Sequence, residues 1–346
     1  MTLRPFDMPR VVPTLRHTQG RPERGRGTRR VEGRPESDER SRGVMRFAGI
    51  FTPIVTPFTS SDAIDETAMR GNVARWMRTP LHGLVVLGSN GEAAQLDDDE
   101  ADRLIEIVRE GVPREKALIA GTGRESTRAT IAATRRAAAL GADAALVRTP
   151  SFFKSQMTAD LFVRHYTDVA DASPVPVLLY NVSMFTGISL PVEAVERLAT
   201  HPNIVGMKES GSDIGLIAEL VARTPDDFIL LAGSGTTLVH ALCAGADGAV
   251  LALAGIAPKL CTDLRTRVGE RRIDEAMALQ RRLMPIARSV GGTFGVPGLK
   301  AALDLIGFIG GPPRPPLRPV SPAVVERIRE ELDALGILEG MHNARG

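Results

Sequence analysis

Short apolar runs and longer helical stretches alternate along most of this chain. From Phe47 onward, a β-branched or apolar run is followed by a polar or glycine-containing turn, and then by a stretch rich in Ala, Arg and Glu. Short runs bounded by such turns predict buried β-strands. The runs are Ile50–Thr56, Leu84–Leu87, Leu118–Ala120, Ala144–Arg148, Val177–Tyr180, Ile204–Lys208, Phe228–Ala232 and Ala249–Leu253.

The stretches between these runs have the length and composition of helices. Strands that alternate with helices form parallel βαβ units, and about eight such units close into a barrel. The pattern therefore predicts an α/β fold, a (β/α)8 TIM barrel over residues 47–256. The predicted helices include Asp98–Glu110, Thr127–Leu140, Ala159–Ala172, Pro191–Thr200, Ile214–Arg223 and Thr237–Ala244.

Beyond the eighth run the pattern is helical, so we expect a C-terminal helical subdomain over residues 257–340. The alternative architecture is an open doubly wound sheet. It is disfavoured because Gly121-Thr122-Gly123 lacks the third glycine of a dinucleotide-binding fingerprint, and we interpret this segment as a strand-end turn. The C-terminal helices are predicted at Ala257–Val268, Ile273–Val290, Val296–Ile306 and Pro322–Leu335.

The composition is that of an ordinary globular protein. Hydrophobic residues make up 43% and charged residues 24% of the chain. No run approaches the roughly 20 apolar residues that span a bilayer, and no secretory signal pattern opens the chain. Cys243 and Cys261 have neither metal nor disulfide spacing, and both are predicted to be inert thiols in core-facing segments. We therefore expect a cytoplasmic protein without a membrane partner.

The first 46 residues differ in charge from the remainder. They hold 12 of the 43 basic and 6 of the 41 acidic residues, so this head is net +6 and the remainder is net −4. A basic arm can bind nucleic acid, and an N-terminal position can indicate a targeting peptide. We favour a disordered extension that buries nothing, or a translation start at Met45 just before the first strand. No nucleic-acid partner is then expected.

Lys208 ends the sixth apolar run, and barrel enzymes carry their functional side chains at such strand ends. Burial disfavours the charged form of lysine, and a neutral amine can attack a ketone to give an imine. The alternative is that the strand simply ends here, with Lys208 in solvent or paired with Glu209. Lysine is scarce in this arginine-rich chain, and arginine could not form an imine, which favours the chemical interpretation.

Two other strand ends carry groups suited to this chemistry. Tyr180, one of only two tyrosines, can relay a proton or simply bond to backbone. Gly88-Ser89-Asn90-Gly91-Glu92 offers a hydroxyl, an amide and backbone N–H groups that suit a carboxylate, and we expect Glu92 to cap its helix. No metal or other cofactor is predicted, because ligand spacing is absent around the histidines that we interpret as structural, His165, His201 and His240.

Four segments, taken in order, match the pattern of a known superfamily over about residues 47–340. They are Thr52-Pro53-Ile54-Val55-Thr56-Pro57-Phe58, Gly88–Glu92, Tyr180-Asn181 with Thr186-Gly187, and Gly206-Met207-Lys208-Glu209. The set resembles the dihydrodipicolinate synthase and N-acetylneuraminate lyase superfamily of pyruvate-dependent barrel lyases. The resemblance implies a Schiff base on Lys208, proton transfer by Tyr180 and assembly as a homotetramer. It also implies that substrate is bound by Ser89, Asn90, Thr56 and Val250.

Two positions depart from the pattern of the synthases. At Phe185 the synthases have an arginine that binds the carboxylate of the second substrate. At Phe153 they have a tyrosine that completes a hydroxyl relay with a neighbouring subunit. We interpret both as specificity positions. The chain is most similar to 4-hydroxy-2-oxoglutarate aldolases, including at Gly295–Lys300, although these have a small polar residue at the position of Phe185 and tyrosines in the strand-four loop.

The sequence therefore predicts a Schiff-base aldolase that cleaves a 4-hydroxy-2-oxo acid to pyruvate and an aldehyde. Within the superfamily, the alternatives are a 4-hydroxy-tetrahydrodipicolinate synthase-like enzyme, a 2-oxo-3-deoxy sugar-acid aldolase or dehydratase, and a hydratase-aldolase. An alternative of another class is a sensor that binds a 2-oxo acid without turning it over. The identity of the aldehyde and the direction of the reaction stay open at this point.

Overall fold

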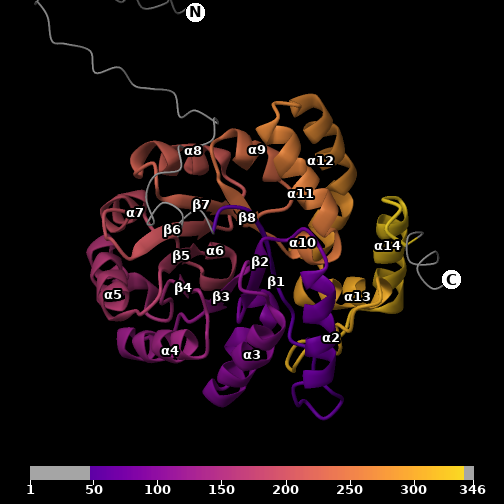
Figure 1. The fold of residues 1–346 in the computed structure, drawn as a ribbon, viewed down its shortest axis with the longest axis horizontal. Coiled ribbons are helices and arrows are strands. Elements are labelled where there is room, and N and C mark those ends of the chain that lie inside the picture. Colours follow the sequence, from indigo (N-terminus) through magenta and orange to yellow (C-terminus); the bar gives the residue numbers. More distant parts are fainter. Residues whose placement is uncertain (1–46, 339–346) are drawn as a thin grey trace, which may run out of the picture. The chain divides into compact units, whose positions relative to one another are not determined.

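The computed structural model describes residues 47–338. The predictions for the basic head lie outside the described residues, as does the end of the chain from residue 339. Eight parallel strands form a closed barrel in sequence order, which confirms the predicted TIM barrel (Figure 1). The strands are β1 (Ile50–Pro53), β2 (Gly83–Val86), β3 (Ala117–Gly121), β4 (Ala144–Arg148), β5 (Val177–Asn181), β6 (Ile204–Glu209), β7 (Ile229–Ala232) and β8 (Gly248–Val250).

Helices alternate with the strands and lie outside them, as Figure 1 shows. Several helices begin where the sequence offers a side-chain cap. Asp97, for example, forms a capping box with Glu100, and the side chains of Ser126 and Thr158 cap the next two α-helices by accepting from a backbone N–H of the first turn. The helices around the barrel are α2 (Glu66–Met77), α3 (Asp98–Gly111), α4 (Thr127–Ala139), α5 (Ala159–Ala172), α6 (Ser183–Thr186), α7 (Val192–Leu198), α8 (Ile214–Arg223) and α9 (Leu238–Cys243).

Only helices follow the eighth strand within the described residues, as predicted. The strand predicted at Ala249–Leu253 is shorter, because the chain turns into a helix at Ala252. The end of the third of these helices, α12, continues as one turn of π-helix that contains two glycines, and such turns are frequent at functional sites. The elements are α10 (Ala252–Ile256), α11 (Pro258–Gly269), α12 (Ile273–Arg288), the π-helix η4 (Ser289–Thr293), α13 (Gly295–Leu305) and α14 (Pro322–Asp333).

The strands bury both of their faces. Leu178 and Tyr180 of β5 belong to an apolar cluster inside the barrel, whereas Val177 and Leu179 pack in the larger cluster that includes the helices. Parallel strands covered on both faces read as continuous apolar runs, which is why these strands were recognisable in the sequence. Side chains fill the interior, so only the ends of the strands are open to chemistry.

The pairing of β5 with β6 contains an irregularity that sets the direction of Lys208. Val177 pairs with Ile204, but the next residue, Leu178, pairs with Gly206, so one extra residue is inserted in β6. Such a bulge reverses the alternation of side chains beyond it. As a result Lys208 is in register with the inward-facing Tyr180.

The two cysteines do not share an environment. Cys261 is fully buried in α11, and burial raises the pKa of its thiol. Cys243 ends α9 and is exposed, so the prediction of a core-facing thiol is wrong for this residue. Among residues 47–338, no helix is both long and apolar enough to cross a bilayer.

Candidate active site

Lys208, Tyr180 and Ser89 form a connected polar group at the carboxyl ends of three strands. The Lys208 side chain is buried, with 5% of the residue exposed, and its Nζ donates to the Tyr180 Oη at 3.3 Å. The same phenol oxygen lies 3.2 Å from the Ser89 Oγ. The Nζ also lies 4.4 Å from the centre of the Tyr180 ring. Lys208 therefore neither extends into solvent nor pairs with Glu209.

The environment of Tyr180 favours loss of its proton. Burial by itself raises the pKa of the phenol, but the positive charge of Lys208 and the hydroxyl groups of Ser89 and Ser210 act in the opposite direction. The net effect lowers the pKa of Tyr180 below its usual value. A phenol with a lowered pKa donates its proton more readily than tyrosine in water, and its phenolate can take a proton back.

Asn181 and Glu209 hold the two strand ends together directly behind this group. They are in register on β5 and β6, and the Asn181 Nδ2 donates to the Glu209 Oε2 at 2.6 Å. The Asn181 Oδ1 accepts from the Leu190 N–H at 3.0 Å, and the Glu209 Oε1 accepts from the Gly211 N–H at 2.6 Å. Burial raises the pKa of Glu209, against the effect of its hydrogen bonds. Both residues belong to motifs that are recognisable in the sequence, but the contact between them was not predicted.

Thr56 holds the loop after β2 in place through a hydrogen bond. The Thr56 Oγ1 donates to the Gly91 carbonyl at 2.7 Å, in the short 3-10 helix η1 (Ser89–Gly91). Thr56 lies beyond the end of β1 and is not among the residues that line the cavity described below, so direct binding of substrate by Thr56 stays a prediction. It supports the loop that presents Ser89 and Asn90.

Glu92 ends this loop in a left-handed conformation and is almost completely buried. Its Oε1 lies 2.6 Å from the Lys300 Nζ of α13, and both side chains are 1% exposed. The Glu92 Oε2 accepts from the Arg314 N–H at 2.8 Å. No side-chain cap is formed at the following short helix, so the prediction of a helix-capping role is wrong. A partner more than 200 positions away could not be read from local sequence.

A cavity of about 430 Å³ opens above Lys208. Of the residues singled out in the sequence, Ser89, Asn90, Tyr180, Val250 and Phe185 line it, whereas Phe153 does not. The side of the cavity formed by the loop after β7 and by the end of α12 was not predicted from the sequence. The loop after β7 could have been predicted, because active sites of such barrels lie at the carboxyl ends of the strands. The contribution of α12 could not, because it depends on how the C-terminal helices pack. The residues contributed there include Ser234, Thr236, Arg288, Gly291 and Gly292.

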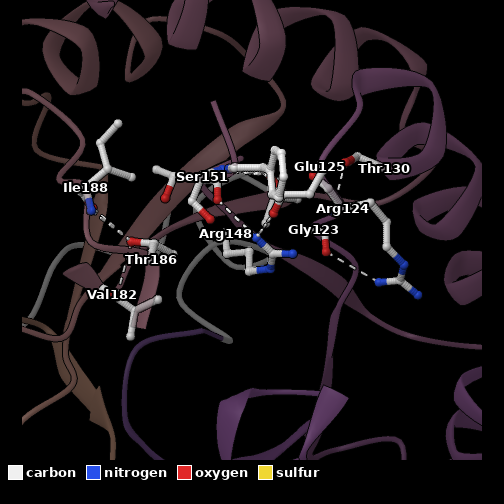
Figure 2. A network of polar contacts seen from close by, with 12 residues as sticks. Gly123, Arg124, Glu125, Thr130, Arg148, Ser151, Val182, Thr186 and Ile188 are labelled. Atoms are coloured by element: carbon white, nitrogen blue, oxygen red, sulfur yellow. Dashed lines mark hydrogen bonds and ion pairs between the residues drawn. The ribbon is translucent and has the colours of Figure 1, made fainter. Parts of the chain in front are cut away.

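The loop after β4 is held by an acidic side chain from the loop after β3. The Glu125 carboxylate accepts from the Arg148 guanidinium at 2.7 Å and from the Ser151 and Phe152 N–H groups, each at 2.8 Å (Figure 2). These contacts counter the effect of burial and lower the pKa of Glu125. The aromatic side chain that follows, Phe153, is 67% exposed in the single chain.

The histidines noted in the sequence lie away from this site. The His165 Nδ1 is 2.9 Å from the Thr127 Oγ1, and the His201 Nε2 is 3.0 Å from the Asp171 carboxylate. Within the part of the chain that the structure describes, no group of three or more His, Cys, Asp or Glu side chains could hold a metal ion.

The family to which this sequence is similar is consistent with the arrangement of Lys208 and Tyr180. Residues 46–335 match the model of the dihydrodipicolinate synthetase family. The chain belongs to this family. It is an enzyme, a Schiff-base lyase that uses pyruvate. This confirms the superfamily expected from the sequence, but the closer likeness to 4-hydroxy-2-oxoglutarate aldolases is not shown.

Individual relatives cover almost the whole described region. The chain is 35% identical to the 4-hydroxy-tetrahydrodipicolinate synthase of Methanopyrus kandleri over 85% of this chain and 98% of that protein. It is 40% identical to the Xanthomonas axonopodis pv. citri protein of the same name, over 81% and 91%. The crystal structure of Thermotoga maritima dihydrodipicolinate synthase superposes with a TM-score of 0.81 at 31% identity, over 85% of this chain and all of that one.

Proposed function

We propose that this enzyme is an aldolase that cleaves a 4-hydroxy-2-oxo acid, similar to 4-hydroxy-2-oxoglutarate, into pyruvate and an aldehyde, with Lys208 as the Schiff-base residue. The observation that carries the proposal is the buried Lys208 Nζ, 3.3 Å from the Tyr180 Oη at the base of the cavity. A nucleophile and a proton-transfer group within hydrogen-bond reach are the minimum needed for imine formation.

The reaction begins when neutral Lys208 attacks the C2 carbonyl carbon of the substrate. Tyr180 delivers a proton to the resulting hydroxyl, water leaves, and a protonated imine remains. The C4 hydroxyl then gives its proton to the Tyr180 phenolate, the C3–C4 bond breaks, and its electron pair moves into the iminium to give an enamine. The aldehyde departs. Protonation of the enamine at C3 and hydrolysis release pyruvate and restore the amine.

The C1 carboxylate of the substrate is assigned to the loop after β2. Ser89 and Asn90 line the cavity there, and Thr56 holds the loop through its bond to Gly91. Val250 supplies the apolar surface beside the methylene carbon. Fixing the carboxylate aligns the ketone with the amine, which turns a collision into an oriented reaction.

Two aromatic side chains support cleavage over the synthase reaction. Phe185 lines the cavity where the synthases have the arginine expected to bind the second substrate. Phe153 stands where they have the relay tyrosine, so proton transfer here is assigned to Tyr180, Ser89 and water. The hydrogen bonds among Lys208, Tyr180 and Ser89 form a path for such transfer.

A second candidate is the synthase reaction itself, because relatives at 35% and 40% identity are named 4-hydroxy-tetrahydrodipicolinate synthase. That product contains the carbons of pyruvate together with those of aspartate semialdehyde. Both reactions begin with the same imine on Lys208 and differ in the aldehyde that the cavity accepts. The identity of the aldehyde therefore separates them.

We also propose that the enzyme assembles as a homotetramer. Its cytoplasmic location stays a prediction. Support for association comes from large apolar side chains exposed on neighbouring loops of the single chain. These lie after β4 and β5 and are 60% to 77% exposed: Phe152, Phe153, Met184 and Phe185. Light scattering after gel filtration tests the assembly, and a monomer at micromolar concentration would contradict it.

Borohydride trapping tests the chemistry. The protein is incubated with pyruvate and borohydride, and the modified peptide is identified by mass spectrometry. We expect one adduct on Lys208 that is lost in Lys208→Arg and retained in Lys259→Arg, a matched control for an exposed lysine paired with Asp263. Binding of pyruvate without an adduct would indicate a sensor and overturn the proposal.

A coupled assay then tests the substrate. Pyruvate release from 4-hydroxy-2-oxo acids is followed with lactate dehydrogenase, and pyruvate consumption with aspartate semialdehyde is measured in parallel. We expect cleavage of 4-hydroxy-2-oxoglutarate to be the faster reaction. Faster condensation with aspartate semialdehyde would assign the synthase activity instead.

A further inference from the structure

The cavity is lined by basic side chains and by no acidic ones among the described residues. The basic side chains are those of Lys208 and Arg288. Lys208 must be neutral to attack a ketone. An arginine guanidinium is a permanent cation, so Arg288 supplies a positive charge to the cavity.

Arg288 is the last residue of α12, and that helix is fixed against the barrel rim by Gln280. The buried Gln280 side chain donates to the Gly235 carbonyl at 2.9 Å and accepts from the Val239 N–H at 3.2 Å. Ala287, next to Arg288, packs close to the same glycine. The end of α12 is thus held beside the loop after β7, on the side of the cavity contributed by the C-terminal helices.

The guanidinium of Arg288 is not engaged elsewhere. Within residues 47–338, the structure shows no ion pair or hydrogen bond from this side chain, and Arg288 is exposed. Its neighbours in the cavity wall are small or glycine residues of η4, Gly291 and Gly292, which leave room for a ligand group beside it. A planar guanidinium binds a carboxylate through two parallel hydrogen bonds.

We propose that Arg288 binds a second carboxylate of the substrate, so that the natural substrate is a 4-hydroxy-2-oxo acid with a carboxylate at each end. The inference rests on the proposed aldolase function and names its substrate class. The first carboxylate lies at Ser89 and Asn90, the reacting ketone at Lys208, and the distal carboxylate at Arg288. Phe185 cannot bind that group, and an arginine from the C-terminal helices takes this role.

The basic lining favours a dicarboxylate over a substrate that yields a purely apolar aldehyde. A methyl or phenyl group at the distal position forms no bond with the exposed guanidinium of Arg288, which then stays solvated by water. A dicarboxylate substrate instead gains a charge-assisted bond and is attracted into a cavity without negative side chains. Arg288 is therefore a specificity-determining residue rather than a member of the proton-transfer group.

The test compares two substrates that differ only at the distal end, 4-hydroxy-2-oxoglutarate and 4-hydroxy-2-oxopentanoate. For Arg288→Ala we expect KM for the dicarboxylate to rise roughly 10- to 100-fold with little change in kcat, the size of a lost hydrogen bond between charged groups. The kinetics of the methyl analogue should be almost unchanged. Arg288→Lys should recover part of the loss, because charge remains but the planar fork does not.

A matched control is Arg282→Ala, which removes an exposed arginine of the same helix that does not line the cavity. It should leave both substrates unaffected. An equal loss for both substrates in Arg288→Ala, or no loss for either, would overturn the inference while borohydride trapping of pyruvate on Lys208 still succeeded. Failure of trapping in the parent enzyme would instead overturn the proposed function, and the inference with it.

Discussion

Tyr180 and Lys208 are paired in register on adjacent parallel strands, with the phenol oxygen 3.3 Å from the amine nitrogen. This relationship depends on the extra residue between Ile204 and Gly206, because without it the alternation of side chains along β6 would turn Lys208 away from the barrel interior. The site is thus produced by strand pairing, and not by the spacing of residues along the chain.

Removing the phenol hydroxyl tests the role of this pair. Tyr180→Phe should lower kcat by roughly 100- to 10,000-fold, the usual contribution of a positioned proton-transfer group, and should slow trapping of pyruvate on Lys208. Tyr166→Phe is the matched control. Its hydroxyl is buried in α5 and donates to the Val147 carbonyl at 3.2 Å, so its loss costs about 1 kcal/mol of stability and leaves turnover nearly unchanged. Equal activity in the two variants would contradict the assignment.

The Asn181–Glu209 contact should act through the position of Lys208. Asn181→Leu leaves the Glu209 carboxylate and the Leu190 N–H without their partner, which costs about 1–3 kcal/mol for each unsatisfied buried group. We expect a lower rate of imine formation, measured by single-turnover trapping, with a smaller change in pyruvate affinity. An unchanged trapping rate in a destabilised variant would show that the contact stabilises the fold without positioning the amine.

The buried Glu92–Lys300 ion pair should contribute strongly to stability only while both partners remain. Lys300→Met leaves the Glu92 carboxylate buried and uncompensated, so we expect a loss of about 3–5 kcal/mol in urea unfolding. The double variant Glu92→Gln with Lys300→Met should recover much of this loss, because the lone charge is then removed. A double variant no more stable than the single one would indicate that packing, and not charge, dominates.

His165 should make the protein less stable as the pH falls. Burial lowers the pKa of this imidazole to about 4, against the opposing effect of the nearby Asp168 and Glu125 carboxylates. Between its unfolded value near 6.5 and about 4, the unfolded chain binds a proton that the folded chain does not, so stability is complete above this window and is lost on descending through it.

The size of this effect is about 2 kcal/mol between pH 7.5 and pH 5. Urea unfolding of the parent and of His165→Gln at both pH values measures it, because the variant lacks this titrating group. The variant should lose less stability than the parent over the same interval. Equal losses would show that His165 is protonated in the folded protein.

The architecture was predictable because its signals are local. The apolar runs, the polar turns and the helical stretches each depend on residues close together in the sequence, so their alternation predicted the closed barrel. Lys208, Tyr180 and Ser89 were recognisable for a related reason, since each stands at the end of an apolar run. Errors arose where a contact was distant, as for Glu92, whose partner lies in α13.

The sequence by itself determined which residue types end each strand and the order in which the strands follow one another, because these depend on neighbours along the chain. Only the tertiary structure decided that Lys208 faces Tyr180, that Thr56 supports the substrate loop from outside the cavity, and that Arg288 reaches it from the C-terminal helices. The physical reason is that register, a bulge and helix docking are settled by packing between segments that are far apart in sequence.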